Sequence, residues 1–222
     1  MSNRHKVAVA ITYLGMGIMV ALTCTQLFPS LQWAGFAVVV GLAGFFIVES
    51  VAGTPAKKSS LRFSTMPDEL KNRTVWLLIG ILACLQITYV VVGNLVFGHA
   101  YIDYDMGRTF AVMNSESIVQ LLVVLPVSAW GEEIAWRGFF LGLKPQKAPF
   151  WVWALLSSVL FAIGHVSTHA VPLVMFGISG NFLCSLILCR LFLETNNCMI
   201  STIGHIVGNY AEILFIMMVF WG

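Results

Sequence analysis

The chain has 222 residues, of which 59% are hydrophobic and only 10% charged, and its mean hydropathy is +0.88. A soluble domain contains about 45–50% apolar and about 25% charged residues, so this composition excludes an ordinary water-soluble globule. The formal net charge of +2 and the lack of a glycine-rich phosphate loop argue against nucleic-acid and nucleotide binding. The sequence therefore predicts an integral membrane protein.

Seven apolar segments are long enough to cross a membrane, which takes about 20 predominantly apolar residues. A basic start (Arg4, Lys6) precedes the first segment, which we interpret as a retained span and not as a cleaved signal peptide. Two polar stretches, Gly53–Arg73 and Tyr101–Asn114, are predicted to be loops. The seven predicted spans are Val7–Phe28, Leu31–Ala52, Val75–Phe97, Ser117–Leu143, Phe150–Val166, Val171–Leu193 and Met199–Trp221.

The positions of lysine and arginine predict the orientation, because cytoplasmic loops carry an excess of both. With a cytoplasmic N-terminus, Arg108 alone of the loop residues falls outside, and Arg137 lies within the fourth span. We therefore expect an all-α, polytopic transmembrane helix bundle of about seven spans in the cell membrane, with its N-terminus cytoplasmic. An eighth, short or re-entrant segment remains an alternative. The basic residues placed inside are Arg4, Lys6, Lys57, Lys58, Arg62, Lys71, Arg73, Lys144, Lys147 and Arg190.

Three ionisable residues lie close together within the predicted fourth span. An ionisable side chain at this depth costs at least about 2.5–3.5 kcal/mol, so it needs a partner or a function. Glu133 and Arg137 are four residues apart and can form an ion pair on one helical face. Glu132 is rotated by about 100° from Glu133, which leaves it free to face a cavity.

Two further spans carry polar residues at helical spacing. Phe161 and His165 are four residues apart on the fifth span, and His205 and Asn209 are four apart on the seventh. A carboxylate and an imidazole that share a water molecule can deprotonate it for attack on a carbonyl group. A histidine and an asparagine on one face can donate hydrogen bonds to the oxyanion that forms.

These three patterns resemble the motifs of the CAAX-protease and bacteriocin-processing family, also called the Abi or CPBP family, which includes the type II CAAX prenyl endopeptidases. The motifs are E-E-x-x-x-R, F-x-x-x-H and H-x-x-x-N, and here they begin at Glu132, Phe161 and His205. The resemblance covers roughly residues 120 to 210. One departure is Trp136, where smaller aromatic residues are commoner, so we expect a differently shaped pocket.

The resemblance implies an intramembrane peptidase and a role for each motif residue. Glu132 and His165 would activate water, and His205 and Asn209 would stabilise the oxyanion. The supporting residues would be Glu133, Arg137 and Phe161. Residues 1–222 would then form a single membrane domain, in which 1–115 are motif-free spans and loops and 116–222 are the catalytic core.

The expected reaction is hydrolysis of a peptide bond in a membrane-associated, hydrophobic or lipidated peptide, with no cofactor and with membrane lipids as surroundings. A zinc protease that uses Glu132, His165 and His205 as ligands is one alternative. A non-enzymatic immunity or scaffold protein and a small transporter are the others. His169, four residues after His165, does not complete an H-E-x-x-H zinc motif. The role of Glu212 stays open.

Two features of the sequence carry less information about function. The five cysteines follow neither a zinc nor a disulfide spacing, and we interpret them as packing residues. Small residues in the first two spans can serve helix packing within one chain or between chains, so the oligomeric state stays open. These small residues are Gly15, Gly17, Gly41 and Gly44.

Overall fold

The computed structural model describes residues 3–28, 30–54, 59–113, 118–145 and 147–220, and these residues form helices and no strand. The predicted all-α class is therefore confirmed. The ends of three predicted segments, Asn114, Ser117 and Trp221, lie outside the described residues, as do Lys57 and Lys58. In chain order the elements are α1 (Asn3–Cys24), η1 (Thr25–Leu27), α2 (Ala34–Ala52), α3 (Met66–Glu69), α4 (Arg73–Phe97), α5 (His99–Met113), α6 (Ile118–Glu133), η2 (Ile134–Leu141), α7 (Phe150–Ile163), α8 (Val171–Thr195) and α9 (Cys198–Phe220).

Five of the described helices are long and apolar enough to cross a membrane, namely α1 with η1, α2, α4, α8 and α9. The α7 helix is apolar but shorter, and α6 continues into η2 as a single rod that carries the charged motif. About seven helices thus correspond to the predicted spans. Large apolar side chains such as Leu14, Leu77 and Leu95 point outward, as expected for a surface that meets lipid. The chain is a multi-pass membrane protein, and the cytoplasmic position of its N-terminus stays a prediction.

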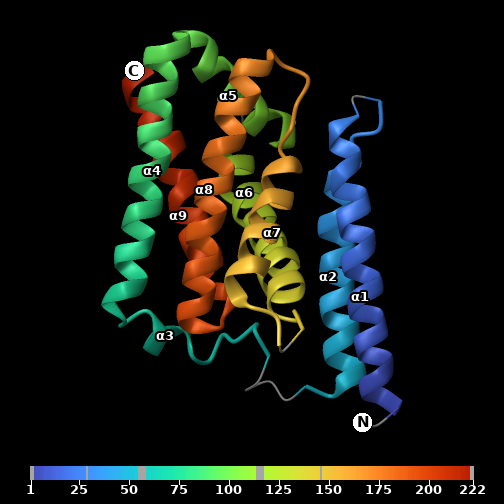
Figure 1. Ribbon diagram of the computed structural model, residues 1–222. Helices are drawn as coiled ribbons and strands as arrows, with labels where there is room; N and C mark the ends of the chain where they lie inside the picture. Colours follow the sequence, from blue (N-terminus) through green and yellow to red (C-terminus); the bar gives the residue numbers. More distant parts are fainter. Residues whose placement is uncertain (1–2, 29, 55–58, 114–117, 146, 221–222) are drawn as a thin grey trace.

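The helices form two groups (Figure 1). The α1–α2 hairpin lies along one side of the bundle, where α2 packs against η2 and α1 contacts α7. On the other side α4 packs against α8 and α9, and α6 lies behind α8. The two groups are joined where the aromatic ring of Phe139 in η2 packs against Gly15 of α1 and Gly44 of α2.

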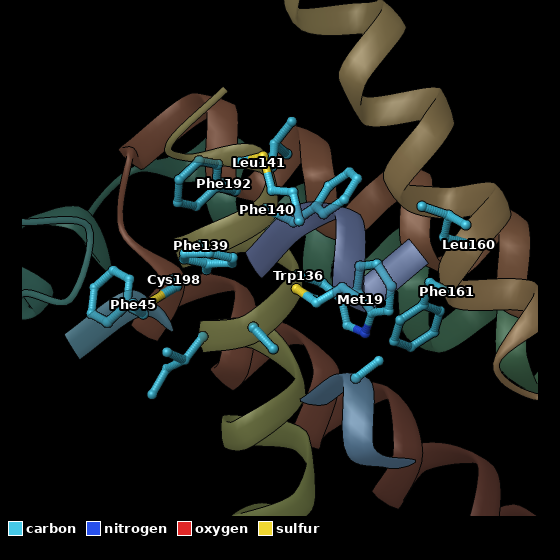
Figure 2. Close-up of a cluster of buried hydrophobic side chains, with 14 of the residues drawn as sticks. Met19, Phe45, Trp136, Phe139, Phe140, Leu141, Leu160, Phe161, Phe192 and Cys198 are labelled. Atoms are coloured by element: carbon cyan, nitrogen blue, oxygen red, sulfur yellow. The ribbon is translucent and has the colours of Figure 1, made fainter. Parts of the chain in front are cut away.

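The main apolar core surrounds η2 and fixes its orientation. Trp136, Phe139 and Phe140 of η2 are at most 3% exposed, and Figure 2 shows them among Met19 and Phe45 of the hairpin. Between helices in a membrane, such packing stabilises the fold through van der Waals contacts and not through removal from water. Because η2 directly follows the two glutamates, this core also determines where they point.

The rod formed by α6 and η2 departs twice from regular α-helical hydrogen bonding. In η2 the amide of Gly142 donates to the carbonyl of Arg137, five residues earlier, over 2.8 Å, which is the π-helical pattern. In α6, Pro126 has no amide hydrogen to donate to Leu122. The hydroxyl of Tyr210 donates to that carbonyl instead, over 3.3 Å, and ties α9 to α6.

One predicted loop was wrong. Within Tyr101–Asn114 the described residues belong to the helix α5, which begins at His99. The charged residues of this stretch suggested a loop, but Tyr101, Ile102 and Tyr104 are buried against the bundle. The segment is therefore an amphipathic helix, and it is not among the helices long and apolar enough to span the membrane.

In the other predicted loop, Gly53–Arg73, the described residues are irregular apart from the short helix α3 and Arg73, which begins α4. Part of this segment docks onto the turn between α8 and α9. Asn197 in that turn is fully buried, and its amide donates to Glu69 over 2.6 Å and to the carbonyl of Arg62 over 2.7 Å. Arg62 also forms an ion pair with Glu69 at 3.2 Å. These bonds fix the start of α9, the helix that carries His205 and Asn209.

Candidate active site

A cavity of about 700 Å³ lies inside the bundle, and Glu132, His165, His205 and Asn209 all line it. They come from α6, the turn after α7, and α9, so the structure brings together the four residues that the sequence predicted to converge. The predicted fifth span is shorter than expected. The α7 helix ends at Ile163, and His165 lies just beyond it.

Glu133 and Arg137 form the predicted ion pair, with 2.8 Å between Arg137 Nη1 and Glu133 Oε1, and both side chains are fully buried. Arg137 also donates to the hydroxyl of Ser185 over 2.7 Å and to its carbonyl over 3.2 Å. The guanidinium carbon lies 4.9 Å from the centre of the Phe161 ring, within range of a cation–π contact. Four elements, α6, η2, α7 and α8, are therefore held by one cation.

Glu133 has a second partner, which sequence spacing does not indicate. Its Oε1 atom lies 3.0 Å from Nδ1 of His205. A carboxylate only accepts hydrogen bonds, so Nδ1 of His205 carries the hydrogen and donates. Glu133 thus fixes the ring of His205 as well as pairing with Arg137.

His165 has a defined tautomer when it is neutral. Its Nδ1 lies 2.7 Å from the carbonyl oxygen of Phe161, and since a carbonyl only accepts, Nδ1 donates. The second ring nitrogen, Nε2, then holds a lone pair that can take a proton. The rings of Phe161 and His165 lie in contact, tilted by 41° with 4.6 Å between their centres, and the supporting role of Phe161 stays a prediction.

Glu132 is half-buried at the cavity wall, in contrast to the fully buried Glu133 beside it. Ser128, one turn earlier on α6, donates its hydroxyl to Glu132 Oε1 over 3.2 Å. That single neutral donor leaves most of the carboxylate's acceptor capacity directed to the cavity. The two adjacent glutamates therefore have different environments, as their rotation around the helix predicted.

Asn209 has a partner that the motif analysis missed. Nε2 of Gln86, at the middle of α4, donates to Asn209 Oδ1 over 3.2 Å. The amide NH₂ of Asn209 is then left to donate elsewhere. Gln86 also lines the cavity, although it lies in a span that matches no motif. A lone glutamine in an apolar run was the only sequence signal, and nothing linked it to a residue so far along the chain.

A second charged group lines the same cavity and includes Glu212, whose role the sequence left open. Glu212 on α9 is hydrogen-bonded to Asp105 on α5, and Arg108 lies close enough to interact with both carboxyl groups. Burial raises the pKa of Asp105 above its ordinary value, although the charge of Arg108 opposes this. Asp105 and Arg108 were missed as cavity residues because their segment was predicted to be a loop.

Trp136 and His169 differ in their relation to the cavity. Trp136 lines it and meets the Phe161 ring edge to face, with 6.5 Å between ring centres, so the unusual aromatic residue does shape the wall. His169 is exposed, and it contacts Ser167 and the ring of Tyr104. Among the residues that the structure describes, no three His, Cys, Asp or Glu side chains converge closely enough to hold a metal ion.

The fold and the cavity together define a multi-pass membrane protein with a chamber that residues from both halves of the chain line, several of them charged or polar. Residues 114–211 match the family model described as type II CAAX prenyl endopeptidase Rce1-like. This match contains all the motif residues and confirms, for this part of the chain, the resemblance to the CAAX-protease family. No curated protein and no solved structure matches the chain.

Proposed function

We propose that this protein is a glutamate-type intramembrane endopeptidase that hydrolyses a peptide bond in a membrane-associated peptide. The observation that supports this most directly is the convergence of Glu132, His165, His205 and Asn209 on one internal cavity. The family description names prenyl endopeptidases, so a prenylated or otherwise lipidated peptide is the substrate class we propose.

Glu132 and His165 are proposed to activate the attacking water. The carboxylate of Glu132 takes a proton from water, and Nε2 of His165 is available as a hydrogen-bond acceptor because Nδ1 donates to Phe161. The water oxygen then bonds to the carbonyl carbon of the scissile peptide. Transfer of the proton to the leaving amine breaks the C–N bond and yields a carboxylate and an amine.

His205 and Asn209 are proposed to hold the oxyanion of the tetrahedral intermediate. Nε2 of His205 can donate only when the ring is an imidazolium, because Nδ1 already donates to Glu133. With the imidazolium formed, Glu132 and Glu133 carry two negative charges and Arg137 and His205 carry two positive charges. The net charge of these four residues is then zero, which suits a site of low dielectric, where an unbalanced charge is costly.

The proposed reaction uses no metal ion. In His165 and in His205, Nδ1 donates a hydrogen bond to a protein oxygen. We propose that Nε2 of His165 takes part in water activation and that Nε2 of His205 binds the oxyanion. The zinc alternative assigns Glu132, His165 and His205 as ligands instead. Metal analysis of the purified protein distinguishes the two: retained zinc together with cleavage abolished by a chelator would refute the metal-free proposal.

The test of the function uses a fluorogenic farnesylated CAAX peptide with the purified protein in detergent and in proteoliposomes. We expect Glu132→Gln and His165→Ala each to lower turnover by about 10²–10⁴-fold, the range for general acid–base groups. Gly17→Ala is a matched control, because a Cβ there meets nothing within 4 Å.

Peptide analysis of cells that carry Glu132→Gln tests the same proposal without a chosen substrate, since a peptide that stays uncut identifies what the enzyme cleaves. If cells with Glu132→Gln or His165→Ala keep the full phenotype of the parent, a non-enzymatic immunity or scaffold role is correct instead. Solute flux in the proteoliposomes without cleavage would favour a transporter.

A further inference from the structure

We infer that Gln86 is a positioning residue for the oxyanion site, a role that rests on the proposed peptidase function. Gln86 lies on α4, outside residues 114–211 that match the family. Its Nε2 donates to Asn209 Oδ1 over 3.2 Å. Oδ1 of Asn209 only accepts hydrogen bonds, so it cannot stabilise an anion. The bond from Gln86 holds this oxygen and leaves the Nδ2 hydrogens of Asn209 to donate to the oxyanion.

The local packing favours this contact. A Cβ added to Gly208 would lie 2.7 Å from Gln86 Oε1 and 3.2 Å from Cγ of Leu82. The glycine beside Asn209 therefore gives α4 the room to approach α9 at this level. Leu82 and Gln86, the two α4 residues next to Gly208, also line the cavity. A substitution at Gly208 should thus displace Gln86 without changing any group that touches the substrate.

An amide in the wrong orientation is unfavourable for catalysis, and the bond to Gln86 opposes that orientation. Without a donor at position 86, Asn209 is free to turn its oxygen toward the cavity, where it would repel an oxyanion. Removing an oxyanion donor costs about 10²–10³-fold in kcat. Losing only its orientation should cost less, so we expect Gln86→Leu to lower kcat by about 10–100-fold with KM little changed.

The decisive variant is Gln86→Glu, which has nearly the shape of the parent side chain but donates only when its carboxyl group is protonated. Its kcat relative to Gln86→Leu should therefore rise as the pH falls, whereas a role in packing alone predicts a constant ratio. Taking the ratio at each pH removes titrations that the variants share. The titratable groups that line the cavity around this position are Tyr89, Tyr101, Asp105, Arg108, Glu132, His165, Cys184, His205 and Glu212.

A double variant and two glycine variants complete the design, each measured with the fluorogenic farnesylated peptide. In an Asn209→Ala background, Gln86→Leu should cause no additional loss of kcat, since the two residues would act through one hydrogen bond. Gly80→Ala on the same helix is the matched control, because its Cβ would meet nothing within 4 Å. Gly208→Ala should lower kcat as Gln86→Leu does.

The outcomes separate this inference from the proposed function. If Glu132→Gln abolishes cleavage but Gln86→Leu keeps the kcat of the parent, the inference is wrong and the peptidase proposal stands. Full cleavage by both Glu132→Gln and Asn209→Ala would refute the catalytic roles proposed for these two residues. If the parent does not cut the farnesylated peptide, a farnesylated CAAX peptide is refuted as the substrate. A structure of Gln86→Leu at a resolution that distinguishes the amide oxygen from the nitrogen, with Asn209 still in the parent orientation, overturns the inference in either case.

Discussion

Removing the positive charge of Arg137 should be among the most damaging single changes outside the cavity. The variant Arg137→Met keeps much of the side-chain volume but removes the permanently charged partner of Glu133, whose remaining partner, His205, is charged only as an imidazolium. Both side chains are fully buried, so neither water nor mobile ions can replace the lost charge. Breaking a buried pair in this way destabilises proteins by about 3–5 kcal/mol.

The double variant Glu133→Gln/Arg137→Met separates stability from activity. Replacing both members of a buried pair by neutral groups is often neutral for stability, so we expect the double variant to recover most of the loss. The glutamine oxygen can still accept from Nδ1 of His205, but it carries no charge to balance an imidazolium. Turnover of the double variant should therefore stay low although the fold is restored.

Unfolding in mixed micelles, followed by helix signal, gives the free energies, and cleavage of the farnesylated peptide gives turnover. The control is Lys71→Met, which breaks the 2.7 Å pair with Asp68 on the surface. Both side chains of that pair are more than three-quarters exposed, so no measurable change in stability is expected. A loss below about 1 kcal/mol for Arg137→Met would refute the reasoning from buried charge.

Three other substitutions have clear expectations. Gly44→Ala should destabilise the fold by about 1–3 kcal/mol in the same unfolding assay, because its Cβ would lie 2.7 Å from an aromatic ring of η2, whereas Gly17→Ala should have no effect. The hydrogen bond between Asp105 and Glu212 requires one carboxyl proton. Because the pKa of Asp105 is raised in the folded protein, the free energy of unfolding should fall as the pH rises from about 4, where an unfolded aspartate titrates. Glu212→Gln supplies an amide donor and should flatten that dependence; an unchanged pH profile would contradict the shared proton. Trp136→Phe should enlarge the cavity and shift peptide selectivity more than turnover, which comparison of peptides of different size would check.

The arrangements that the sequence predicted well are those between residues four apart, which helical geometry brings to one face. Glu133 and Arg137 form an ion pair, and His205 and Asn209 line the same cavity. That geometry is local, so it can be derived without knowing the fold. The assignment of separate roles to Glu132 and Glu133 had the same basis. Their catalytic and supporting functions remain predictions, while their different environments are part of the structure.

The contacts that the sequence did not predict join residues far apart in the chain. The bonds from Gln86 to Asn209 and from Glu133 to His205 depend on how α4, α6 and α9 pack, and no local spacing encodes this. The helix α5 was missed for a different reason. Two of its charged residues, Asp105 and Arg108, line the cavity, and a sequence pattern cannot distinguish such a cavity from bulk water.

The two adjacent glutamates indicate why only one of them is suited to act as the base. Glu133 is fully buried and is held by Arg137 and His205, so a proton arriving there would break contacts that orient the site. Glu132 lines the cavity and accepts from the neutral hydroxyl of Ser128, so it can gain and lose a proton with little change in its surroundings. The same residue type is thus suited to structural support in one environment and to proton transfer in the other. It follows that exchanging the roles would require moving the partners and not the glutamates themselves.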